Sequence, residues 1–494
     1  MRPRILCAIA LVLIILAIPA VEWATCGGGG GGGTGGMTAG GPAGPGAGGG
    51  SSADTQVYMV PWKLLKPEDP QVVAGMILYW FPSSKEELAK SSLRTSQTLS
   101  HYAVQCVSME VTTLDTPFGR KLPADTKLPI AILANPDGTI IAKAENKDGF
   151  LKVDQVEKMV ETEFKHREDT VKQEMDDAKN KAKGGDNDGA IKLYRAVVEQ
   201  KCLFPGKAKD AVNALKKLGV NESVVIPQPM IYDRAIEAQI NKIMRQGLRA
   251  ELDAKYIQAE KLYSQAHEMD PADPVPLRYL GELYRHHIGD WAKARVAFQQ
   301  ILDQPSDPMS RAVALHGLGK MTIHDGEFKK GLALMEESVK TYPLVLAYRN
   351  LAVYWNSEGE PAKAAEYVKL ALDLAPQDPY NVVFAATFMA ASGHNDEALK
   401  IAKENESLLS ASYNLAAIYA QAGDKEKALA LLKRHFFEYE RYQSVRSKEM
   451  MEARVDAVFL SLRRDPAFVA LTNDADGKLD PPRPMTAAPP GSMK

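Results

Sequence analysis

The sequence predicts a multidomain protein in which a small α/β domain is followed by an all-α helical solenoid. A glycine-rich tract separates the N-terminus from the rest, because 16 of the 37 glycines lie in residues 27–50. Strand-like and helix-like segments alternate in residues 54–165. From about residue 173 the strand signal ends, and a helical pattern recurs with small residues in phase. The 494 residues are sufficient for roughly three domains.

Composition excludes two broad classes of protein. The 60 Lys and Arg residues against 62 Asp and Glu residues leave no basic surplus, which a general nucleic-acid binder would need. Two of the four cysteines lie within the first 26 residues, so the chain is not a scaffold framed by disulfides. We therefore expect an ordinary globular protein with no nucleic-acid partner.

Residues 1–26 are expected to be an export signal. Arg2 and Arg4 form a charged start, and residues 5–20 are apolar apart from one proline. The segment that ends at Cys26 resembles the lipobox of bacterial lipoproteins, although Trp23 and Thr25 depart from that pattern. The resemblance implies lipidation of Cys26 and a membrane contact through the lipid. Cleavage after Ala20, or a retained N-terminal anchor, are the alternatives.

Residues 27–53 are expected to be a disordered linker. This stretch is rich in glycine, alanine and serine and offers almost no apolar surface to bury. Gly-rich chain statistics give it a root-mean-square span of about 25 to 30 Å. Its expected role is to hold the folded domains away from a membrane surface.

Residues 54–165 are expected to form the α/β domain. The pattern predicts strands at 75–81 and 104–112, a helix at 85–102, a hairpin at 130–143 and a helix at 153–164. Asp137-Gly138 supplies the hairpin turn, because glycine adopts positive φ at little cost.

This order of elements, with Leu128-Pro129 just before the hairpin, resembles the thioredoxin fold, in which a proline at that place is cis. Thioredoxins carry Cys-x-x-Cys at the first strand-to-helix turn, but here that turn reads Pro82-Ser83-Ser84. The peroxidatic cysteine position of peroxiredoxins, which the turn also resembles, is occupied by Ala89. The domain is therefore expected to lack catalytic cysteines. Cys106 is interpreted as a buried apolar residue.

The helical part resembles a tetratricopeptide repeat array. Small residues recur at regular positions relative to turn glycines and bulky residues. Starting from Ala259, successive small residues are 30 to 37 residues apart. These small residues are Ala190, Ala259, Ala294, Gly331, Ala364, Ala398 and Ala428. We expect a helical connector with one repeat-like unit at 166–235, the array with a C-terminal cap at 236–472, and a disordered tail at 473–494.

The resemblance also implies a concave groove lined by the first helix of each repeat. The expected partner-binding side chains are Arg278, Arg285, His316, Lys320, Arg349, Asn356, Tyr380 and Tyr413. Because the centre of this surface is basic, it suits an extended peptide or protein partner, including an acidic one. An ordinary solvated helix face is the alternative interpretation.

The sequence contains no pattern for a metal site or a cofactor. His286 and His287 are adjacent, so on a helix they point in different directions, and no acid or thiol pairs with them at ligand spacing. The expected function is a non-enzymatic protein-binding scaffold of the cell envelope, either a membrane-anchored lipoprotein or periplasmic. The alternatives are a redox or folding accessory that uses Cys106 or Cys202, and a self-assembling structural envelope protein.

Overall fold

The computed structural model describes residues 57–65, 72, 74–84, 87–88, 91–146, 149–231, 233–376, 378–409, 413–439 and 443–473. The expected signal peptide with Cys26, the linker at 27–53, Ala89 and the tail from residue 474 lie outside the described residues. The chain divides into two compact units. We call residues 57–323 with 329–344 the first unit, and residues 324–328 with 345–473 the second unit.

The first unit contains a five-stranded mixed sheet with the order β1-β3-β2-β4-β5. The strands are β1 (Lys63–Leu64), β2 (Met76–Phe81), β3 (Val107–Val111), β4 (Ile130–Ala134) and β5 (Ile140–Glu145). Strand β3 is parallel to β1 and β2, whereas β4 is antiparallel to β2 and β5. Every residue of the apolar strands β2 and β4 is buried, as central strands require. The Leu128–Pro129 peptide bond is cis, the isomer that the resemblance implies.

The segment expected to be one helix at 85–102 is interrupted. A 3-10 turn, η3 (Ser92–Arg94), precedes helix α2 (Gln97–Val104). Serine hydroxyls explain this, because the side chains of Ser91 and Ser96 accept hydrogen bonds from the backbone N–H groups of Leu93 and Leu99. The next strand starts at Val107 rather than at residue 104.

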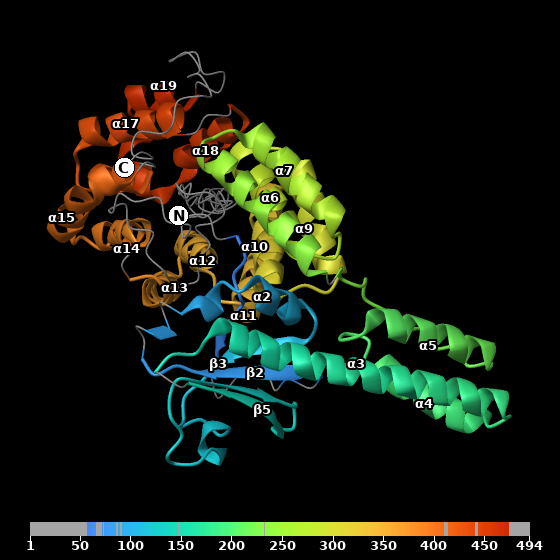
Figure 1. Cartoon of the computed structure of the whole chain (residues 1–494). Helices are drawn as coiled ribbons and strands as arrows, with labels where there is room; N and C mark the ends of the chain where they lie inside the picture. The colour runs from blue at the N-terminus through green and yellow to red at the C-terminus, as the bar shows by residue number, and fades with distance from the viewer. Residues whose placement is uncertain are drawn as a thin grey trace, which may run out of the picture. The chain divides into compact units, whose positions relative to one another are not determined.

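The helix expected to end at residue 164 continues without a break into the connector. Helix α3 (Val153–Lys183) contains no proline or glycine that could stop it, and it ends where Gly184 and Gly185 follow. Helices α4 (Asn187–Glu199) and α5 (Pro205–Lys217) lie beside it (Figure 1). A continuous apolar core joins the sheet to these three helices.

The interpretation of Cys106 as a buried apolar residue is wrong. Its sulfur is bonded to that of Cys202, 96 residues further along the chain. Cys106 has φ 58 and occupies the turn between α2 and β3, and Cys202 lies in the turn between α4 and α5. The disulfide therefore connects the α/β part to the helical connector within the first unit.

Paired helices follow from α6 to α17 (Figure 1). They are α6 (Arg234–Leu252), α7 (Tyr256–Met269), α8 (Pro274–Glu282), α9 (Trp291–Asp303), α10 (Pro308–His324), α11 (Phe328–Thr341), α12 (Val345–Ser357), α13 (Pro361–Leu374), α14 (Pro379–Ala391), α15 (Asn395–Asn405), α16 (Tyr413–Gln421) and α17 (Lys425–Arg434). The six in-phase alanines are all 0% exposed. A Cβ on Gly331 would lie 2.5 Å from the carbonyl oxygen of Gly319, so only glycine permits this approach of α10 and α11.

The second unit ends with α18 (Gln443–Val455), the 3-10 helix η8 (Ala457–Leu462) and α19 (Pro466–Asn473). Helix α19 is capped at its N-terminus, because the Asp465 side chain accepts hydrogen bonds from the backbone N–H groups of Ala467 and Phe468. Among the described residues, no helix combines the length and apolarity that crossing a membrane requires.

Candidate partner-binding surfaces

In the first unit, the repeats hold a segment of the chain itself. The carbonyl oxygen of Val57 accepts hydrogen bonds from the Arg278 guanidinium, at 3.5 Å, and from the Tyr279 hydroxyl, at 3.4 Å. The hydroxyl of Tyr342, just after α11, donates to the carbonyl oxygen of Trp62 at 3.4 Å. Val57 and Tyr58 are at most 1% exposed. The segment 57–62 therefore lies against the repeats as a ligand peptide would.

A buried ion cluster fixes the α/β part to the same repeats. His101 of α2 lies 2.8 Å from Glu237 of α6 through Nδ1, and 3.8 Å from Asp273 through Nε2. Tyr58 donates a 2.6 Å hydrogen bond to Asp273. Burial alone would lower the pKa of His101, but Asp273 and Glu237 raise it to about 10. The buried imidazole is therefore protonated at neutral pH and neutralises one of the two carboxylates.

The other basic side chains expected in this part of the groove are also buried. Arg285 forms an ion pair of 2.7 Å with Glu282 one helical turn earlier. Burial alone would raise the pKa of Glu282, but Arg285 holds it well below its usual range. Burial lowers the pKa of His316 well below its usual value, and the charge of Arg285 adds to this effect. With Lys320 at 5% exposure, this region offers little free positive charge to a partner.

In the second unit, the expected groove residues fall into two groups. Arg349 is buried and lies over the Phe384 ring, with its guanidinium carbon 5.9 Å from the ring centre. Tyr413 is buried and donates a 2.9 Å hydrogen bond to Asp456. Asn356 of α12 and Tyr380 of α14, by contrast, are only half-buried. These two are the expected side chains that a partner could contact most readily.

Several side chains in these clusters were not found from the sequence. Asp456 lies beyond the last repeat, while Tyr58 and His101 belong to the α/β part. No local pattern marks them, because their partners are distant in sequence. Within the described ranges, no three His, Cys, Asp or Glu side chains are grouped closely enough to hold a metal ion.

The turn after β2, where the resemblance places a Cys-x-x-Cys motif, forms local hydrogen bonds between side chains and the backbone. The Ser84 hydroxyl accepts a hydrogen bond from the backbone N–H of Glu87, and the Glu87 carboxylate accepts one from the backbone N–H of Ser83. This pair of hydrogen bonds is a helix-capping arrangement. The two cysteines considered for a redox role, Cys106 and Cys202, are bonded to each other.

Comparison with known proteins identifies the repeats. Residues 277–306 and 325–379 match family models described as tetratricopeptide repeat. The chain is also similar to the Photosystem I assembly protein Ycf3 of Rippkaea orientalis, with 28% identity over 123 residues, which is 22% of this chain and 69% of that protein. The chain therefore contains tetratricopeptide repeats. Repeats of this kind act as scaffolds that bind protein partners.

Proposed function

We propose that this protein is a non-enzymatic scaffold of the cell envelope, whose repeats bind extended segments of a partner protein. The observation that carries the proposal is the segment 57–62, a peptide without helix or strand that is held by Arg278, Tyr279 and Tyr342 of the repeats. Repeats that hold one peptide segment through its backbone carbonyl oxygens are suited to holding another. The similarity to a protein named for assembly favours a partner met during the assembly of a complex.

The proposed partner site is the face formed by α12 and α14 in the second unit. In the first unit, Arg278 is bonded to Val57 and Arg285 is neutralised by Glu282, so these charges do not select an acidic partner. The half-buried Asn356 and Tyr380 offer an amide and an aromatic ring. Such a surface suits a neutral peptide with apolar side chains.

The α/β part is proposed to be a thioredoxin-like module that no longer performs thiol chemistry. The strand order β1-β3-β2-β4-β5 and the cis Leu128–Pro129 bond support this assignment. The capped turn at Ser83 and Ser84 carries no thiol. An insulin-reduction assay on the purified protein tests the proposal, and turnover that is lost in Cys106→Ser would overturn it.

Export from the cytoplasm is proposed from two features. The N-terminal sequence has the charge and apolar pattern of a signal, and Cys106 and Cys202 form a disulfide, which persists in oxidising compartments. Mass spectrometry of the mature protein tests this. An acylated N-terminal Cys26 supports a lipid tether, and a mature chain that starts at residue 21 removes it.

Site-specific photo-crosslinking tests the partner site. We expect benzoylphenylalanine at position 356 or 380 to form an adduct with one partner protein in cells. The same probe at Lys369, whose side chain is 76% exposed on α13, the helix between α12 and α14 in the sequence, serves as the matched control. Equal adducts from all three positions, or none from 356 and 380, would contradict the assignment. Combined Asn356→Ala and Tyr380→Ala should then reduce partner affinity about tenfold without loss of helix content.

A further inference from the structure

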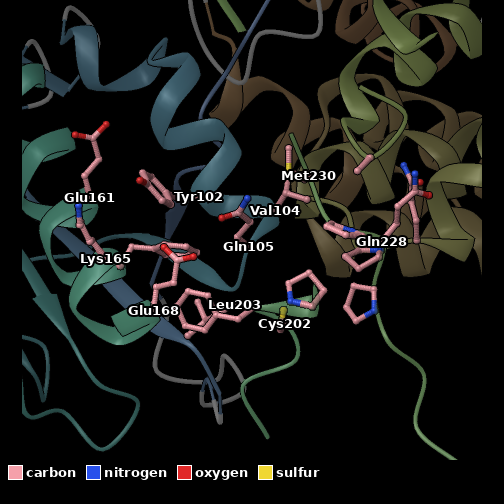
Figure 2. Close-up of a pocket in the computed structure, with 18 residues that line it drawn as sticks. Tyr102, Val104, Gln105, Glu161, Lys165, Glu168, Cys202, Leu203, Gln228 and Met230 are labelled. Atoms are coloured by element: carbon pink, nitrogen blue, oxygen red, sulfur yellow. The ribbon is translucent and has the colours of Figure 1, made fainter. Parts of the chain in front are cut away.

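A cavity of 480 Å³ lies within the first unit (Figure 2). It is bordered by the end of α2, one face of α3, the turn between α4 and α5, the segment 227–230, and two loops between repeat helices. This volume lies in the range of small-ligand sites, and such sites are common where domains meet. The cavity is separate from the proposed partner site on α12 and α14, so either proposal can fail without the other.

Aromatic and other apolar side chains form much of the cavity wall. The rings of Tyr102 and Phe164 are 5.2 Å apart, and those of Phe164 and Phe204 are 4.9 Å apart. Leu203 and Met230 extend this apolar surface. Figure 2 shows Tyr102, Leu203 and Met230 among the side chains that surround the cavity. Such a surface favours an apolar group as occupant.

Amide side chains supply the polar part of the wall. Gln105, Gln228 and Gln304 all border the cavity. The Nε2 atom of Gln304 is buried and has no hydrogen-bond partner among the described residues. A buried amide donor without an acceptor is unfavourable, and a ligand carbonyl oxygen would satisfy it.

The charges on the cavity wall do not favour an anionic occupant. Glu161 is paired with the Arg234 guanidinium, and the remaining wall charges, of Glu168 and Lys165, are opposite in sign. A fatty acid carboxylate or a phosphate would therefore find no net positive charge to bind it. A neutral peptide segment with an apolar side chain fits both the apolar wall and the amides.

The disulfide holds two walls of the cavity together. Gln105 directly precedes Cys106, and Leu203 directly follows Cys202. The Cα atoms of the two cysteines are 5.8 Å apart, so this bond fixes the end of α2 against the turn between α4 and α5. A cavity with fixed walls is pre-organised for a ligand.

We infer that this cavity is a second binding site, which takes an apolar side chain of a partner polypeptide, with a backbone carbonyl of that polypeptide accepting a hydrogen bond from Gln304. The test uses the full chain labelled with carbon-13 at its methionine methyl groups. The Met230 signal, assigned with Met230→Leu, reports on the cavity. The probes are acetyl-Gly-Phe-Gly-amide, acetyl-Gly-Glu-Gly-amide and decanoate.

We expect the phenylalanine peptide to shift the Met230 signal saturably, and the other two probes to leave it unchanged. No saturable shift with the phenylalanine peptide would overturn the proposal. A saturable shift with decanoate but not with the peptide would assign the cavity to an acyl chain and would overturn it as well.

Variants test the hydrogen bond and the wall. Gln304→Leu keeps the approximate size of the side chain and should weaken peptide binding about fivefold. Its matched control is Gln299→Leu at an exposed position of α9, the helix that directly precedes Gln304, which should leave peptide binding unchanged. Cys106→Ser combined with Cys202→Ser should weaken binding further. Equal binding by wild type and Gln304→Leu would contradict the role of Gln304, and an unchanged affinity in a folded double serine variant would contradict the role of the disulfide.

Discussion

The two units bury different groups of ionisable side chains. In the first unit, His101 lies between Glu237 and Asp273, and Arg285 lies against Glu282. In the second unit, the acids Glu449, Glu452 and Asp456 are all at most 9% exposed on or next to α18, where Arg446 is 5% exposed. His324 lies 2.5 Å from Glu452, and His435 lies 3.6 Å from Glu449. Helical repeats alone therefore do not determine which ionisable side chains a unit buries.

This difference places the pH sensitivity of the two units in separate ranges. The pKa of His101 is raised to about 10 in the folded state, so its stabilisation is complete below about pH 6.5 and is lost as the pH rises through 10. Burial raises the pKa of Asp456 to about 7, although hydrogen bonds from Val458 and Tyr413 oppose this. The stabilisation by protonated Asp456 is complete below about pH 4 and is lost as the pH rises through 7.

The largest expected effect is that of His101→Leu. It leaves the buried carboxylates of Glu237 and Asp273 without a positive partner, and breaking a buried pair in this way costs about 3 to 5 kcal/mol. Hydrogen exchange measured by mass spectrometry should show faster exchange in α2 and α6 than in wild type. The second unit, measured in the same experiment, should exchange at the wild-type rate.

A matched exposed histidine provides the control for this variant. The His166 side chain is 75% exposed and lies 3.7 Å from Glu163, so His166→Leu should change stability by less than about 0.5 kcal/mol. In wild type, protection of α2 and α6 should also decline between about pH 6.5 and 10. A loss of less than about 1 kcal/mol in His101→Leu would show that the ion cluster does not hold the first unit together.

The next largest effect, a gain in stability rather than a loss, is expected for Asp456→Asn. Above pH 7 the wild type must keep a buried carboxylate close to Glu452, whereas asparagine carries no charge and can still cap η8. One pKa unit corresponds to about 1.4 kcal/mol. Since Tyr413 bonds less strongly to an amide oxygen, we expect a gain on the order of 2 kcal/mol at pH 8.

The gain from Asp456→Asn should shrink as the pH falls toward 4. Hydrogen exchange in α16 and α18 at pH 8 and at pH 5 measures it, with Asp373→Asn as the control, because the Asp373 side chain is 61% exposed. A gain of equal size at both pH values would mean that the charge of Asp456 is not its source.

Local patterns were sufficient to predict the repeats and most of the sheet. The in-phase alanines are all fully buried, because a helix pair needs a small side chain at each close approach. The hairpin turn was predictable in the same way, and Gly138 has φ 84. The interruption at Ser92 was missed because serine hydroxyls compete locally with the helix.

Contacts between distant residues could not be predicted in the same way. Tyr58 and Asp273 are 215 positions apart, and a single sequence holds no signal that joins them. The disulfide between Cys106 and Cys202 spans 96 positions, and the connectivity of cysteines does not follow from their spacing. The resemblance to a peptide-binding groove therefore could not indicate which side chains of the repeat helices the chain itself would contact.

The smallest expected changes in stability come from replacing a glycine in a turn of the second unit and a glycine in a helix of the first unit. Gly423 ends the turn between α16 and α17 with φ 87, and a Cβ there would meet nothing within 4 Å. Gly423→Ala should therefore cost about 1 kcal/mol through backbone conformation alone. Gly206 in α5 is equally open but lacks positive φ, so Gly206→Ala should stabilise the first unit by about 0.5 kcal/mol. Denaturant titrations of both variants measure these changes. An equal loss of stability in both variants would show that positive φ does not explain the glycine at position 423.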